Sequence, residues 1–230
     1  MIARALLLAA ALACAAPAAA QTGGVQVAPV LVEMTPERAF GSLRVRNGRA
    51  RPAAFEVDVY AWTQVNGEDV LTPTDALVVA PGVFETQPGG EQVIRIGAAT
   101  PEPGRETAFR IIIRELPATR ADGARLGFTL EMSLPVFITP AGARANVTAE
   151  AGAARGLVLT NAGAARARLI SVETAAGAAI AAPRYLLAGA VAATPLPHDA
   201  GAVRVRFYEG ATAVERIVQV DDADSRSSMR

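Results

Sequence analysis

The chain has 230 residues, and its 22 basic and 22 acidic side chains give a formal net charge of zero at pH 7. This balance provides no long-range field that would attract the chain to nucleic acid or to an anionic membrane. After the N-terminal segment, no stretch approaches the roughly 18 unbroken apolar residues that a transmembrane helix needs.

The first twenty residues have the pattern of a secretory signal peptide. Arg4 precedes an apolar run from Ala5 to Ala16, and Ala18 to Ala20 provide the small residues of a cleavage site. We predict cleavage before Gln21. The only cysteine, Cys14, lies within this segment, so the mature chain can form neither a disulfide nor a thiolate metal site. Lipidation at Cys14 is disfavoured because the preceding residues match a lipobox poorly.

Residues 21–142 have the alternation of an all-β domain. Short apolar runs are separated by Gly, Pro and Asn, as in strands joined by turns. The expected strands are Val25 to Val32, Ser42 to Asn47, Ala54 to Trp62, Leu77 to Ala80, Gln92 to Gly97 and Ala108 to Leu116. Asn66 and Gly67 form a strong hairpin signal. Helical periodicity is absent.

One later run has a long row of apolar side chains at every second position. The row consists of Phe128, Leu130, Met132, Leu134, Val136 and Ile138. In a strand these side chains project from one face. Pro135 has no amide hydrogen and favours an edge position. Because a long apolar edge promotes aggregation unless a partner covers it, the row is either an ordinary half-buried strand or one kept for a partner.

A second, smaller all-β domain is expected at residues 146–221. Pro140 to Gly142 and the polar stretch to Val147 mark the expected domain boundary, and short alternating runs resume at Ala149 and continue to Val220. Residues 222–230 are charged and rich in Ser, which predicts a flexible tail.

The mature sequence offers little for enzyme chemistry. His198 is the only histidine, and it lies in a predicted loop without clustered partners for catalysis or metal binding. Gly-rich runs such as Pro88 to Gly90 lack the lysine and the helix of a phosphate-binding loop. We therefore expect no catalytic residue, metal, cofactor or small-molecule substrate.

Several arginines interrupt the apolar strands. Arg95 lies between Ile94 and Ile96, and Arg110 and Arg114 are expected on one face of their strand. One interpretation is that they face solvent or pair with nearby Glu91, Glu106 or Glu115. The other is a basic pocket between two sandwich domains, where guanidinium groups bind a carboxylate.

Short motifs along the mature chain resemble, in the same order, those of the periplasmic chaperones of the chaperone–usher pathway, and most closely the branch that serves spore-coat-U-like pilins. They are Val27 to Pro29, Met34 to Pro36, Leu43 to Asn47, Ala61 to Gln64, Pro88 to Gly97, Phe109 with Arg110, Arg114 to Pro117 and Leu134 to Ile138. Leu157 to Asn161 and Ala167 to Leu169 add a weaker match in the second domain.

This resemblance implies two immunoglobulin-like β-sandwiches in an L-shaped arrangement. It also implies a non-enzymatic function in the periplasm. A pilin is a sandwich that lacks its last strand, and the chaperone fills the open groove by lending it Phe128, Leu130, Met132, Leu134 and Val136. An outer-membrane usher then passes the subunit to the growing fibre, without a nucleotide.

Many relatives hold the C-terminal carboxylate of the pilin with a basic residue of the first strand and a lysine of the donor strand. Here Thr35 with Pro36 and Pro135 occupy the matching places. We hypothesise that Arg95 and Arg110 act instead, because both belong to the matching motifs.

Two alternatives to the chaperone remain open at this point. An adhesive or ligand-binding sandwich module would use the same fold, although Trp62 is the only tryptophan and sugar sites favour clustered aromatics. A periplasmic enzyme is disfavoured by the lone histidine. If the chain is a chaperone, its apolar row favours self-association into a dimer when no pilin is bound.

Overall fold

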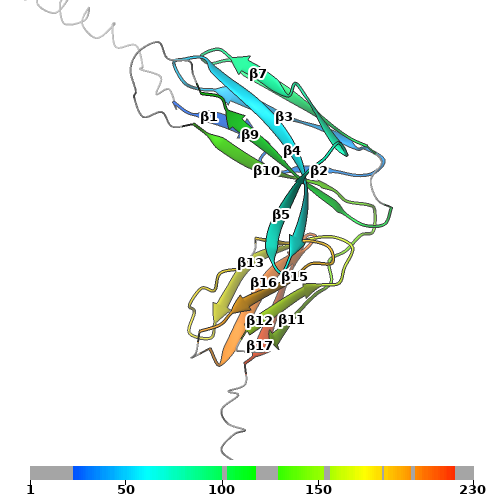
Figure 1. Cartoon of the computed structure of the whole chain (residues 1–230). Coiled ribbons are helices and arrows are strands. Elements are labelled where there is room, and N and C mark those ends of the chain that lie inside the picture. Colours follow the sequence, from blue (N-terminus) through cyan, green and yellow to red (C-terminus); the bar gives the residue numbers. More distant parts are fainter. Residues whose placement is uncertain are drawn as a thin grey trace, which may run out of the picture.

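The computed structural model describes residues 23–99, 103–117, 129–152, 156–182, 184–197 and 200–220. Within these ranges the chain forms the strands β1 to β17, and none of the described residues forms a helix that could cross a membrane. Figure 1 shows two bodies of strands that meet at an angle, so the predicted all-β fold is confirmed. The signal peptide with Cys14, Phe128, His198 and the tail at 222–230 lie outside the described residues.

The first sandwich is built from two sheets. One sheet has the order β1 (Val25–Ala28), β3 (Phe40–Asn47), β8 (Glu91–Ala98) and β6 (Leu77–Ala80). The other has the order β2 (Val32–Met34), β10 (Glu131–Ile138), β9 (Thr107–Glu115), β4 (Ala53–Val65) and β5 (Glu68–Pro73), with β7 (Val83–Thr86) also paired to β4.

The predicted first strand, Val25 to Val32, is wrong in one respect, because it is two strands in different sheets. β1 pairs with β3, whereas β2 pairs with β10. Pro29 lies between the two strands and has no amide hydrogen, so a ladder cannot continue through it. The chain crosses here from one sheet to the other.

Alternate side chains of both sheets fill the first core. Leu43, Ile94, Phe55, Ile111 and Ile113 are all fully buried. The period of two in their sequence places these residues on the inner faces, which is why the strands form a sandwich.

The second sandwich is smaller. One sheet has the order β11 (Val147–Gly152), β12 (Gly156–Asn161) and β15 (Val191–Pro195), and the other has the order β14 (Tyr185–Leu186), β13 (Ala167–Thr174), β16 (Ala202–Glu209) and β17 (Thr212–Gln219). Leu157, Leu159, Val203, Val205 and Phe207 are fully buried between them.

The two sandwiches share an apolar junction. Trp62 and Phe137 of the first sandwich belong to the same buried cluster as the core of the second. Their ring centroids lie 5.6 Å apart, and the ring of Tyr185 lies 5.8 Å from Trp62 and 5.4 Å from Phe137. Such aromatic contacts add to the area that the junction buries.

A long hairpin reinforces this junction. Strands β4 and β5 meet at Asn66 and Gly67, as the sequence predicts. The amide of Gln64 donates to the carbonyl of Tyr185, and its carbonyl oxygen accepts from the N–H of Leu187, both at 2.9 Å. The tip of the hairpin therefore lies against the second sandwich, and Figure 1 shows it reaching downward from the first.

An ionic network closes the other part of the junction. The carboxylate of Glu106 is almost completely buried and accepts hydrogen bonds from the guanidinium and the backbone N–H of Arg166 and from the hydroxyl of Thr139. The same guanidinium also bonds Glu33 and lies 3.7 Å from the centroid of the Phe137 ring. Arg166 therefore ties the second sandwich to β2, to β10 and to the residue that precedes β9.

Candidate functional site

Strand β10 has an open edge. It pairs with β9 along its whole length, from Glu131 to Ile138, but on its other side β2 pairs only with residues from Val136 to Ile138. Residues Glu131 to Pro135 therefore have no strand on that side among the described parts of the chain. The prediction that Pro135 marks an edge is confirmed.

The apolar row of this strand divides into two parts. Leu134 and Val136 are 4% and 0% exposed and belong to the core of the first sandwich. Leu130 and Met132 are half-buried, and Met132 only borders that core. The open edge thus carries the accessible part of the row, and Phe128 would continue it in sequence.

Phe137 has a role that the sequence interpretation missed. It points to the opposite face from Val136, is fully buried and joins the junction with Trp62 and Tyr185. A signal was available, because the unbroken run Val136, Phe137 and Ile138 is typical of a strand that is buried on both faces.

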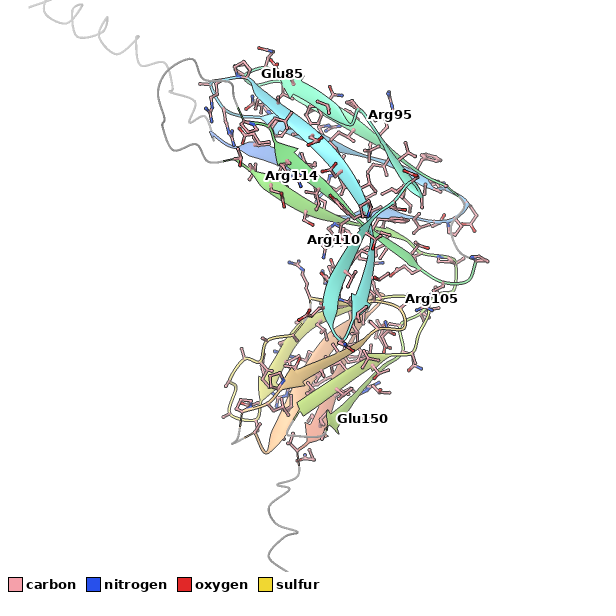
Figure 2. The ribbon with its side chains drawn as sticks, viewed as in Figure 1. Glu85, Arg95, Arg105, Arg110, Arg114 and Glu150 are labelled. Carbon is pink, nitrogen blue, oxygen red and sulfur yellow. The ribbon has the colours of Figure 1, made fainter. Side chains whose placement is uncertain are left out.

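Arg110 lies on the outer face of the same sheet, at the corner between the sandwiches (Figure 2). In the register of β9 and β10 it is directly opposite Pro135. Its guanidinium stacks on the Trp62 ring at 3.7 Å from the centroid, and a nitrogen lies 3.5 Å from the Asp69 carboxylate. This stacking orients the guanidinium, whose side chain keeps 18% of its surface exposed.

The pKa of Arg110 is lowered, chiefly by burial, and the carboxylate of Asp69 opposes this effect. Tyr185 also raises the pKa, whereas the positive charge of Arg184 lowers it further. An arginine remains cationic at physiological pH despite such shifts. The corner therefore holds a partly desolvated and weakly paired positive charge.

Arg95 lies on a different surface. It is exposed on β8, in the other sheet of the first sandwich, beside an apolar groove that includes Phe40, Val78 and Val93. Figure 2 shows Arg95 well away from Arg110. The structure does not bring the two hypothesised anchor residues together.

The predicted acidic partners of these two arginines are bound to other residues. Glu91 pairs with Arg44 at 2.8 Å and Glu115 pairs with Arg49 at 2.5 Å, whereas Glu106 pairs with Arg166. Within the described residues, neither Arg95 nor Arg110 has an ion pair with any of the three.

Arg114 is neutralised on the same outer face. Its guanidinium lies 2.8 Å from Asp58 and 3.0 Å from Glu131, and hydrogen bonds to Glu131 and then to Asp58 raise its pKa. Of the arginines on this face of β9, Arg110 is therefore the better candidate for binding an external carboxylate.

No group of three or more His, Cys, Asp or Glu side chains is placed to hold a metal ion in the part of the chain that the structure describes.

Comparisons with known proteins agree with this geometry. The model of the family described as "Pili and flagellar-assembly chaperone, PapD N-terminal domain" matches residues 24–144. A comparison with curated proteins found no match.

Three solved structures have the same fold. A chain of the CsuC–CsuE chaperone and tip subunit complex from Acinetobacter baumannii has a TM-score of 0.68 and 17% identity, covering 86% of this chain and 99% of that chain. A chain of the Salmonella enterica complex of the SafA pilin with the SafB chaperone has a TM-score of 0.66 and 17% identity, covering 84% of this chain and 96% of that chain. The Escherichia coli chaperone DraB has a TM-score of 0.64 and 20% identity, covering 86% of this chain and 97% of that chain. The two-sandwich fold is thereby confirmed.

Proposed function

This chain belongs to the family of pilus and flagellar-assembly chaperones, and we propose that it binds pilin subunits in the periplasm by lending them strand β10. The family consists of chaperones and not of enzymes. The open edge of β10, from Glu131 to Pro135, is the observation that supports this mechanism best.

Strand addition uses the backbone of this edge. The unpaired N–H and C=O groups on the open side can bond an extended strand of the subunit, and such main-chain bonds supply affinity without sequence specificity. The half-buried side chains of Leu130 and Met132, continued by Phe128, enter the apolar groove of the pilin. Because Leu134 and Val136 are buried in the chaperone core, their part is to hold the donor strand in place.

Arg110 is the anchor that we assign to the C-terminal carboxylate of the pilin. It lies opposite Pro135, the place where many relatives have a lysine, and Trp62 orients its guanidinium. A guanidinium can bind a carboxylate through two parallel hydrogen bonds. The position of Arg95 in the other sheet makes it unsuitable for the same carboxylate.

We further propose which partners this chain binds. The relative SafB is named in a complex with a pilin, and CsuC is named in a complex with a tip subunit. We infer that this chain binds a subunit of the same kind. Its motifs favour spore-coat-U-like pilins as clients and an outer-membrane usher as the acceptor. Without a client, the open edge favours pairing with a second copy of the chain.

The proposed domain limits follow the sheets. Residues 21–142 include β1 to β10, and residues 146–221 include β11 to β17. Residues 1–20 are proposed as the cleaved signal peptide and residues 222–230 as a tail.

The test is co-purification with the small secreted pilin encoded beside this chain. We expect a stoichiometric complex, and we expect Met132→Asp to abolish it because the charge would enter an apolar groove. Ser133→Asp is the matched control, since Ser133 is exposed on the opposite face. If the wild-type chain captures no neighbouring secreted protein, or if both variants bind equally well, strand donation through this row is wrong.

A further inference from the structure

Two arginines of the second sandwich lie beside the corner that holds Arg110. Arg184 immediately precedes Tyr185, and Arg168 is opposite Tyr185 in the register of β13 and β14. Tyr185 packs edge-on against Trp62, and Trp62 carries the guanidinium of Arg110 on its ring face. Arg184 and Arg168 therefore adjoin, through the chain and the strand pairing, a residue that packs against the ring on which Arg110 stacks.

The positive charge of this group is poorly compensated. The only carboxylate close to Arg110 among the described residues is that of Asp69, which is 44% exposed and 3.5 Å away. Asp69 also accepts a hydrogen bond from Gln64. Within the described ranges, no carboxylate lies within ion-pair distance of Arg168 or Arg184.

Several other arginines of the chain are better paired. Arg114 has carboxylates at 2.8 and 3.0 Å, Arg206 has Glu173 at 3.0 Å, and Arg166 bonds two glutamates. Within the described ranges, Arg168 and Arg184 lack the acidic partners that these three arginines have. Like charges held close together disfavour one another unless an anion joins them.

The surface beside these residues is also hollowed. Arg168, Arg184 and Tyr208 line a groove of about 590 Å³ with Ile180. The guanidinium of Arg168 lies 4.7 Å from the centroid of the Tyr208 ring, which restrains its position. Arg168 and Arg184 thus line one hollow and can offer their donors to the same carboxylate.

We propose that Arg184, supported by Arg168, is the second-domain half of the site that binds the C-terminal carboxylate of the pilin. This inference rests on the proposed function, in which Arg110 is the first-domain half. The family resemblance implies two basic residues of the first domain in many relatives, whereas in this proposal the second positive charge comes from the other domain. Client binding would then depend on the arrangement of the two sandwiches.

The experiment measures how fast the purified complex dissociates. The probes are the secreted pilin encoded beside this chain and the same pilin with two added C-terminal glycines, which move the carboxylate by about 7 Å. We expect Arg184→Ala to shorten the lifetime with the natural pilin about 5-fold, as for removal of one ion pair. With the extended pilin the same substitution should have no effect. Arg216→Ala, on exposed β17, is the matched control and should leave both lifetimes unchanged.

The outcomes separate the inference from the proposed function. In one outcome the wild-type complex forms and Arg110→Ala weakens it, but neither Arg184→Ala nor the double variant of Arg168 and Arg184 does. The assignment of a carboxylate site to the second domain is then wrong, whereas strand donation stands. An equal loss with both pilins would also overturn it, because the effect would not depend on the carboxylate. If no complex forms, both proposals fail. Unchanged circular dichroism of each variant verifies its folding.

Discussion

Replacement of Arg166 by Met should separate the two sandwiches more than any other single polar change. The guanidinium of Arg166 bonds Glu106 and Glu33 and covers the ring of Phe137. Methionine keeps much of the apolar volume but removes the positive charge. The carboxylate of Glu106 would then remain buried with only the hydroxyl of Thr139 and one backbone N–H as donors.

The size of the effect follows from burial. Removing one partner of a buried ion pair costs about 3 to 5 kcal/mol. The side chain of Glu106 is 2% exposed and that of Arg166 is 14% exposed, so the pair is buried but its cation keeps some contact with water. We therefore expect the lower end, about 3 kcal/mol. In a chain of this size each kcal/mol lowers the melting temperature by roughly 2 to 4 °C, which gives a loss of about 6 to 12 °C.

The assay is thermal unfolding followed by calorimetry and circular dichroism. Arg206→Met is the matched control, because its pair with Glu173 is on the surface and should contribute little to the free energy of unfolding. Adding Glu106→Gln to Arg166→Met should restore part of the loss, since it removes the unpaired buried charge. A melting temperature of Arg166→Met within about 2 °C of the wild type would refute the reasoning.

Three further predictions concern the junction, the hairpin and the second sandwich. Phe137→Ala should cost about 3 to 5 kcal/mol and shift the emission of Trp62, the only tryptophan, to longer wavelength as water reaches it; unchanged fluorescence would contradict the described packing. Gly67→Val should lower the free energy of unfolding in urea by more than about 1 kcal/mol, because Gly67 has a φ of 84° and a side chain there would approach the β15 backbone to 3.0 Å. Gly89→Ala is the control, since Gly89 has a φ of 72° but lies in open space, so this variant reports backbone strain without the contact. Hydrogen bonds from Ser171 and then Arg206 lower the pKa of Glu173. The ionised Glu173 therefore stabilises the fold above its unfolded pKa, and this stabilisation is lost as pH falls through its folded pKa. In an NMR titration of Ser171→Ala the midpoint of Glu173 should rise, and an unchanged midpoint would refute the role of Ser171.

Local sequence patterns predicted much of the strand content. Alternation identified the runs that became β3, β4, β8 and β9, and Asn66 with Gly67 identified the hairpin. These features depend on neighbours within a few residues, since side chains in a strand alternate between faces. The edge character of β10 could be inferred from Pro135 alone, because the missing amide hydrogen belongs to the residue itself.

Burial within the apolar row could not be inferred in the same way. Alternation shows that Leu130, Met132, Leu134 and Val136 share a face, but it does not show where β2 begins to cover the strand. That limit depends on the pairing of Val32 with Val136, which lie far apart in sequence. The tertiary structure alone separates the buried end of the row from the open one.

The sequence by itself determined an all-β chain with an apolar edge strand and arginines placed within its strands. Only the tertiary structure decided which arginine has which partner. Arg110 reaches the corner because it is opposite Pro135 and stacks on Trp62, Arg95 belongs to the other sheet, and Arg166 meets Glu106 across the domain junction. The physical reason is that charge compensation and burial depend on groups brought together by folding, whereas alternation is a property of the local backbone.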